Sequence, residues 1–503
     1  MNPALPVALP VLLPLVTALG LLALGRPSRR RRVVAAAGAA AQLVVALFLV
    51  ARTAGGDRLV QAVGHWSPPF GIALVADPLA AIMLSLGALT VLAGIVYGFL
   101  EMPVAHEHPL RLPLLQFLAL GINLSFLTGD LFNLFVAFEI LLIASYALLT
   151  LEADDWDVKQ AFPYLALNVV GSTLFFAAAG LAYALFGTLN FAQIAERAPA
   201  LVGDARLTAL AVLLTGVFGL KAGLFPLYYW LPPSYPTLPT PVAAIFSGML
   251  TKVGIYVLIR MFATVLPHEL TGLHALIAWL SGATMLLGVV GAISRNFIRG
   301  ILSFHILSQV AFMTLALGFF TPLALTAAVF YIVHHIVVKG SLFLVGGTAA
   351  LLNRTDDLNR MGGLWVAAPW LGLAFLAQAL SLAGVPPLSG FWGKYLIVVE
   401  GLRLGEYALV VASIVASLLT LFSMLKIWLA AFWGPAPAAG VHTDDRRWRG
   451  LTWVCAVLAA LSLGLGLGAE ALLRLAGTAA AAALDQAGYI EAVLGVIGKD
   501  RTS

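Results

Sequence analysis

Cysteine is almost absent from this chain, and charged side chains are scarce. Cys455 is its only cysteine among 503 residues, so the chain by itself can form no intrachain disulfide, iron–sulfur cluster or cysteine-ligated zinc site. Only 10% of the residues are charged and 61% are hydrophobic, which is far outside the range of soluble globular proteins. We therefore expect an all-α polytopic membrane protein that carries no cofactor and performs no redox chemistry of its own.

The net charge of +5 does not indicate a nucleic-acid partner. Five of the positive charges form one cluster between two apolar segments, which is typical of a topology signal: Arg26, Arg29, Arg30, Arg31 and Arg32. The first apolar segment has no charged side chain before it, and its arginines follow it, the reverse of a cleavable signal peptide. It is predicted to remain as a first membrane helix.

Apolar stretches long enough to cross a bilayer, about 20 residues each, predict about fourteen transmembrane helices. They lie near residues 4–25, 33–51, 75–100, 110–128, 131–151, 162–186, 207–231, 241–262, 271–293, 300–318, 322–352, 365–399, 407–433 and 451–475. With alternate loops assigned to the cytoplasm, the inner loops hold fourteen basic residues and the outer loops and tail hold nine, Arg260 among them. This bias predicts that both termini face outward.

Ionisable side chains occur deep inside these stretches. They are Lys221, Lys252, Lys339, Lys394 and Glu139. A charge at the bilayer centre costs about 2.5–3.5 kcal/mol, so five of them cost about 10 kcal/mol or more. Because lysine, histidine and glutamate can hold or release a proton, such a row indicates a proton path. The structural alternative is a static ion pair between Glu139 and Lys221 that only ties two helices together.

Proline interrupts two of the predicted helices, helix 7 and helix 12. Pro226 follows Lys221 by five residues in helix 7, and Pro386–Pro387 precedes Lys394 in helix 12. A helix broken at membrane depth must line protein or water rather than lipid, and broken helices at corresponding places point to a transport path. Kinks that serve only packing are the alternative.

A resemblance to a known family covers most of the chain. The family is that of the proton-translocating antiporter subunits of respiratory complex I, membrane hydrogenases and Mrp-type multisubunit cation/proton antiporters. Its signature region resembles residues 220–261, LKAGLFPLYYWLPPSYPTLPTPVAAIFSGMLTKVGIYVLIRM. Its glutamate-bearing fifth helix resembles LSFLTGDLFNLFVAFEILLIASYAL from Leu124, and its broken twelfth helix resembles SLAGVPPLSGFWGKY from Ser381. The start, MNPALPVALPVLLPLVTALG, the run GSTLFFAAAGLAYALFGTLNFAQI and the chain length resemble the D-type subunits of the Mrp (Mnh/Sha) Na⁺/H⁺ antiporters.

The resemblance implies two inverted five-helix repeats, helices 4–8 and 9–13. An odd number of helices per repeat gives the two repeats opposite orientations. The implied divisions are residues 1–109 (helices 1–3), 110–262 (first repeat), 263–433 (second repeat) and 434–503 (helix 14 and a C-terminal tail).

The resemblance also implies roles for the ionisable residues. Glu139 and Lys221 match the family's paired glutamate and lysine, Lys252 its central lysine, and Lys394 its terminal basic residue. Complex I subunits of similar length often carry glutamate at that last position, so lysine there favours the Mrp type. Opening of the Glu139 and Lys221 pair is expected to release a proton from Lys221 toward Lys252.

Histidines on helix 11 are candidates to continue this path. His335 and Lys339 are four residues apart and share one helix face, so they can bridge Lys252 to Lys394, whereas His334 points elsewhere. We call Glu139, Lys221, Lys252, His335, Lys339 and Lys394 the buried row. His305, His334 and Asp130 are possible further relays. The histidines fit plain interhelical hydrogen bonds equally well, and Asp130 fits a helix N-cap or the outer mouth.

The resulting hypothesis is a proton-translocating subunit of a Na⁺/H⁺ antiporter in the cell membrane of a bacterium, and not an enzyme. Its implied partners are the Mrp subunits of types A, B, C, E, F and G, the lipid bilayer, protons and Na⁺, although no pattern marks a Na⁺ site. The alternatives are a redox-driven pump subunit of complex I or a membrane hydrogenase, and an assembly scaffold without its own path. A lone major-facilitator carrier does not fit, because the loop ARTAGGDRLVQAVGHW is not the basic, glycine-rich loop of that class.

Overall fold

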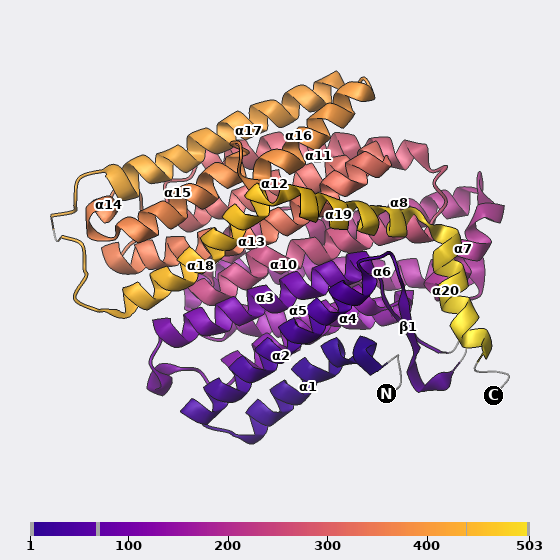
Figure 1. Cartoon of the computed structure of the whole chain (residues 1–503), viewed down its shortest axis with the longest axis horizontal. Helices are drawn as coiled ribbons and strands as arrows, with labels where there is room; N and C mark the ends of the chain where they lie inside the picture. The colour runs from indigo at the N-terminus through magenta and orange to yellow at the C-terminus, as the bar shows by residue number, and fades with distance from the viewer. Residues whose placement is uncertain (1–4, 67–70, 439, 500–503) are drawn as a thin grey trace.

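The computed structural model describes residues 5–66, 71–438 and 440–499. Long helices lie side by side in one bundle (Figure 1), and the strands of the described residues form a single antiparallel hairpin, β1 (Leu59–Ala62) with β2 (Ala73–Ala76). Within these ranges twelve helices are long and apolar enough to cross a membrane. This confirms the predicted all-helical membrane fold.

The helices of the first half are α1 (Leu5–Ala23), α2 (Arg29–Thr53), α3 (Pro78–Glu101), α4 (Arg111–Leu127), α5 (Leu131–Thr150), α6 (Asp155–Phe186), α7 (Phe191–Arg197), α8 (Ala205–Ala222), α9 (Leu231–Ser234) and α10 (Thr240–Ile259). Those of the second half are α11 (Thr271–Ile293), α12 (Ile298–Phe319), α13 (Pro322–Asn353), α14 (Leu364–Ala367), α15 (Pro369–Ala383), α16 (Ser389–Arg403), α17 (Tyr407–Ile427), α18 (Arg447–Leu467), α19 (Ala469–Leu484) and α20 (Gln486–Lys499).

Each predicted span has a counterpart among these helices. The two that fall short of a full crossing are α4 and the divided helix 12, which is built from α15 and α16. The count of fourteen spans and the inverted repeats stay predictions.

Acidic residues begin several of the helices, as their sequence context predicts. Asp77 precedes Pro78, and its Oδ1 accepts a hydrogen bond from the Ala80 backbone N–H at 2.9 Å. Asp130 caps α5 in the same way, through the Asn133 N–H at 2.8 Å. A carboxylate at these positions satisfies one of the backbone donors that a helix N-terminus leaves free.

Both predicted helix breaks are present and share one local geometry. Helix α8 ends at Gly223 with φ 85°, and α15 ends at Gly384 with φ 91°. In each case the next residue, Leu224 or Val385, donates its N–H to a carbonyl five residues back. Glycine suits this left-handed position because it has no Cβ. The breaks leave carbonyl groups of the last turn available to other donors.

The helices α10 and α13 form the centre of the bundle, and their membrane-spanning windows are entirely buried by the rest of the protein. Helix α13 packs against α10, α12, α16, α18 and α19. A helix that is apolar all round belongs in such a core. Because Lys252 lies on α10 and Lys339 on α13, these ionisable residues are enclosed by protein instead of lipid.

Two regions differ from the sequence prediction. Arg260 was expected in an outer loop, but α10 continues as a π-helix over Arg260–Val265 and the arginine is 3% exposed. The chain after residue 451 was expected to form one helix and a tail. Instead α18 ends at Leu467, α19 packs on α13 and α3, and α20 packs on α7 and β1. Hydropathy does not mark the boundary between α18 and α19, because the sequence stays apolar through Gly468.

The contact between α8 and α10 has no room for a side chain at Gly254. A Cβ there would lie 2.7 Å from the Ala222 backbone nitrogen. We expect Gly254→Ala to lower the stability of the fold by about 1–3 kcal/mol, because neither helix backbone can move freely. Thermal unfolding of the purified protein measures this.

Gly180→Ala on α6 is the matched control, since nothing lies within 4 Å of its added Cβ. Equal melting temperatures for the two variants would contradict the tight α8–α10 contact.

Candidate functional site

The lysines and the histidine of the buried row come from four helices and all lie inside the protein. Lys252, His335 and Lys339 are 0% exposed, Lys221 is 4% and Lys394 is 6% exposed. Glu139 on α5 is half-buried. Such burial is costly for a charged group unless hydrogen bonds or a partner charge offset it, so the surroundings of each side chain indicate what it can do.

Lys221 lies in the last turn of α8, just before the Gly223 break. Its Nζ donates hydrogen bonds to Asn168 of α6, at 3.1 Å to Oδ1 and 3.2 Å to the backbone oxygen. The C-terminal end of a helix also favours a positive charge. Sequence reasoning missed Asn168, whose only signal is an amide in an apolar span.

Glu139 was expected to pair with Lys221. Its Oε1 atom has no hydrogen-bond partner among the residues that the structure describes, and the lysine is held by Asn168 instead. The carboxylate is nevertheless close enough to act on Lys221 electrostatically. The hydrogen-bond acceptors of Lys221 are therefore the Asn168 side-chain and backbone oxygens and not the carboxylate.

The middle of the row consists of Lys252, His335 and Lys339. Lys252 Nζ donates to the Ser247 carbonyl oxygen of its own helix at 2.6 Å. In the described part of the chain, both ring nitrogens of His335 and the Nζ of Lys339 have no hydrogen-bond partner. Lys252 and Lys339 both act on His335 electrostatically. Buried groups with unused donors and acceptors are suited to passing protons through water.

Lys394 uses the second helix break. It lies on α16, and its Nζ donates to the Leu382 and Ala383 carbonyl oxygens at 2.9 and 3.2 Å. These carbonyls end α15, where the helix dipole favours a cation. The ammonium also lies 4.5 Å from the ring centre of Phe312. A cavity of about 350 Å³ between α16 and α17 reaches this lysine.

The possible relays lie in separate surroundings. His305 Nε2 is 2.5 Å from Ser423 Oγ, and His334 Nδ1 is 2.8 Å from Ser389 Oγ. The contact with Ser389 directs His334 toward α16. Asp130 serves as the cap of α5, and burial raises the pKa of its carboxyl.

Gln309 is a further polar residue in the core that sequence reasoning missed. Its Oε1 accepts from the Tyr331 hydroxyl, and its Nε2 donates to Thr420 Oγ1 at 3.3 Å. It therefore joins α13 to α17 beside His305. Across the described ranges, no group of three histidine, cysteine or acidic side chains is placed to hold a metal ion.

Comparison with known proteins relates this geometry to one family. The family described as NADH:quinone oxidoreductase/Mrp antiporter, TM matches residues 128–420. The D-type subunit of the Na(+)/H(+) antiporter of Alkalihalophilus pseudofirmus is 39% identical over 491 residues, which cover 97% of this chain and 99% of that protein.

Solved structures show the same fold. A chain of the Mrp complex from Dietzia sp. DQ12-45-1b superposes with a TM-score of 0.91 at 32% identity and covers 98% of this chain and 100% of that one. A chain of respiratory complex I from Thermus thermophilus superposes with a TM-score of 0.74 at 24% identity, covering 92% of this chain and 98% of that one.

Two lysines of the buried row, Lys339 in its middle and Lys394 at its end, differ in accessibility, which cysteine substitution can test. We expect Lys394→Cys to react with N-ethylmaleimide in membranes at least roughly tenfold faster than Lys339→Cys, because thiol reactivity requires access. Lys394 lines a cavity, whereas Lys339 is 0% exposed. Mass spectrometry of the labelled peptide measures this. The native Cys455 is 0% exposed and gives little background. Equal labelling of both positions would show that the row is not sealed at Lys339.

Proposed function

Because the chain belongs to the NADH:quinone oxidoreductase/Mrp antiporter family, we propose that it is the proton-translocating subunit of a multisubunit Na⁺/H⁺ antiporter. The observation that carries this proposal is the buried row itself. Its lysines and histidine occupy helices α8, α10, α13 and α16 at the centre of an apolar bundle, where ionisable groups are rare and functional. The chain is a transporter subunit and not an enzyme.

The degree of similarity favours an antiporter over a redox-driven pump. The relative named as an antiporter subunit is 39% identical, and the Mrp complex chain is 32% identical. The complex I chain is 24% identical and supports the fold alone. The proposed partners are the other Mrp subunits, of types A, B, C, E, F and G, in the cell membrane of a bacterium with both termini outside.

Contacts between helices suggest the order of the path. Lys221 lies next to α10, because a Cβ on Gly254 would touch its backbone, and Lys252 belongs to the same helix. Lys252 is followed by His335 and Lys339, which act on each other electrostatically. Lys339 and Lys394 both act electrostatically on His305. A proton that enters at Lys221 would therefore leave through Lys394.

Glu139 is the proposed switch at the start of this path. When it closes on Lys221 it stabilises the ammonium, at about 4 Å by roughly 4 kcal/mol for an effective dielectric near 20. When the pair opens, Lys221 retains only the neutral Asn168 as its partner. The proton is then released more easily toward Lys252. The contact between Lys221 and Asn168 supports the second of these states.

Substitution within the pair tests the path. We expect Lys221→Ala and Glu139→Ala each to lower Na⁺-dependent proton movement at least roughly tenfold, because each removes an ionisable group of the proposed path. The measurement is proton flux in everted vesicles that contain the full complex, with assembly verified for every variant.

Lys426→Ala is the matched control. This lysine lies at the end of α17, and its Nζ donates to the Ile293 and Arg295 carbonyl oxygens and to Asn296 Oδ1. Its role is structural, so exchange should persist. Normal exchange in Lys221→Ala would refute the path and leave this chain as an assembly scaffold.

A further inference from the structure

A second buried charge pair lies outside the buried row. Arg260 Nη1 and Nη2 donate to the two carboxylate oxygens of Asp77 at 2.6 and 2.9 Å. Asp77 is 0% exposed, and the same carboxylate caps α3. The bidentate geometry holds both planar groups in one orientation. A buried ion pair is weak evidence for stability, since apolar residues of similar size often stabilise as well.

Tyr256 links this pair to the helix of the central lysine. Its hydroxyl accepts from Arg260 Nη2 at 2.9 Å and donates to the Phe126 carbonyl oxygen at 2.5 Å. Lys252, Tyr256 and Arg260 follow one another at four-residue intervals, so they share a face of α10. The rise from Lys252 to Arg260 is about 12 Å. We call Asp77, Tyr256 and Arg260 the clamp.

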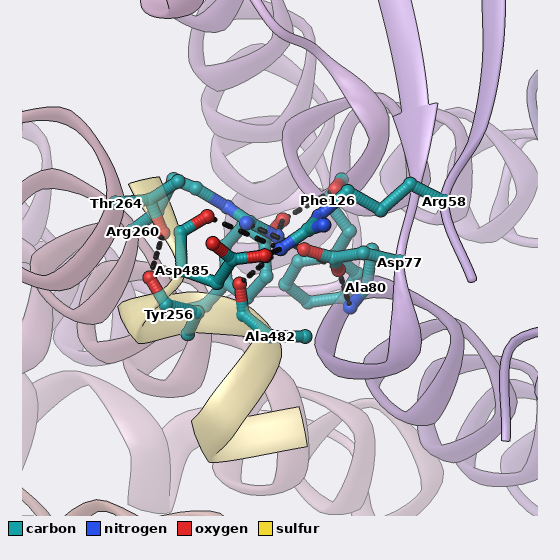
Figure 2. A network of polar contacts seen from close by, with 10 residues as sticks. Arg58, Asp77, Ala80, Phe126, Tyr256, Arg260, Thr264, Ala482 and Asp485 are labelled. Carbon is teal, nitrogen blue, oxygen red and sulfur yellow. Dashed lines mark hydrogen bonds and ion pairs between the residues drawn. The ribbon is translucent and has the colours of Figure 1, made fainter. Parts of the chain in front are cut away.

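The C-terminal segment covers the clamp. Figure 2 shows Asp77, Arg260 and Tyr256 meeting residues from the α19–α20 turn. Thr264 Oγ1 donates to the Ala483 carbonyl oxygen at 2.8 Å, and Arg58 reaches the Ala482 carbonyl oxygen at 2.9 Å and Asp485 Oδ2 at 3.0 Å. The Tyr489 ring lies 5.7 Å from the Arg260 guanidinium. The pair is thus shielded from water. In such surroundings the charge of either group, if left unpaired, would be felt over a longer distance than in water.

Other ionisable groups lie on the elements that pack against α10 and its π-helical continuation. Their charges also contribute to the electrostatic potential at Lys252 and Arg260. The elements packed against α10 carry Lys221 on α8, His335 and Lys339 on α13, and His305 on α12. Helix α3 carries Asp77 at its start with Tyr97 and Glu101 near its end, and α4 carries Arg111. Around Arg260 the ionisable groups are Tyr256, Tyr489, Arg58 and Asp485, with Glu196 and Arg197 on α7. Asp77 is the carboxylate that binds Arg260 directly.

We propose that Asp77 is a positioning residue that neutralises Arg260, so that the central lysine of the proton path is protonated in the working pH range. An unpaired arginine on the same helix would repel a proton from Lys252. Paired with Asp77, it contributes no net charge and still anchors α10 through Tyr256. This inference rests on the proposed function, because it assumes that Lys252 carries protons.

The test is the pH profile of Na⁺-dependent proton movement in vesicles with the full complex. Asp77→Asn retains a capping side chain for α3 but leaves Arg260 unpaired. At about 12 Å and an effective dielectric near 20, the uncompensated charge shifts the alkaline limb to lower pH by up to about one unit. Arg260→Gln leaves Asp77 without its arginine and shifts that limb to higher pH. This shift is the smaller of the two, because a buried carboxyl that loses its partner is partly protonated. Asp77→Asn/Arg260→Gln restores the wild-type profile.

Asp204→Asn is the matched control. It removes a carboxylate that pairs with Arg206 at the solvent-exposed start of α8, where water screens the change, so the profile should stay in place. A merely structural clamp predicts a different pattern, with lower activity in all three clamp variants and no opposite shifts. If Asp77→Asn fails to assemble, Arg260→Gln and the double variant decide the question.

The outcomes separate this inference from the proposed function. Lys252→Ala reports on the path itself in the same vesicles. If it abolishes exchange while neither single clamp variant shifts the profile, only the role of the clamp is overturned. If Lys252→Ala retains exchange, the proton path and this inference fail together. Assembly of the double variant alone, with neither single variant assembling, would also overturn the inference and make the clamp a folding element.

Discussion

The cost of enclosing positive charge in an apolar helix bundle is the constraint on which this structure depends. Each buried ion loses several kcal/mol of hydration unless protein dipoles or an opposite charge replace the water. The chain meets this cost in different ways along its length. Lys221 binds the amide of Asn168, Lys394 binds carbonyls at a helix end, and Arg260 binds a full carboxylate. These solutions have different consequences, because neutral partners leave a proton mobile and a carboxylate holds it.

The helix break at Gly384 makes the neutral solution at Lys394 possible. In an unbroken helix the carbonyls of Leu382 and Ala383 would accept bonds from the following turn. The turn at Gly384 ends the ladder there and frees them for Lys394. The same turn at Gly223 places Lys221 at the end of α8. Carbonyls at a helix break therefore accept the hydrogen bonds of Lys394, whereas Lys221 takes its acceptors from Asn168 of α6.

Helix α10 and its π-helical continuation carry two charged sites with different surroundings, Lys252 and Arg260. Lys252 donates one short hydrogen bond to a carbonyl of its own helix, which packs on the helix of His335 and Lys339. The side-chain nitrogens of these two residues have no hydrogen-bond partner among the described residues. Two turns away, Arg260 is fixed by Asp77, Tyr256 and the C-terminal cover. An unpaired charge at Arg260 would act on Lys252, because a single unpaired charge acts over more than about 10 Å in a poorly screened medium.

Sequence alone determined that this is a helical membrane protein, where most spans begin and end, where two helices break, and that the lysines of the buried row lie inside the bundle. These follow from local hydropathy and from the fixed backbone behaviour of proline and glycine. It could not reveal that Asn168 binds Lys221, that Arg260 is buried against Asp77, or that α19 and α20 fold back over the bundle. Those contacts join residues far apart in the chain, such as the 183 positions between Asp77 and Arg260, and only tertiary packing decides which distant polar groups meet.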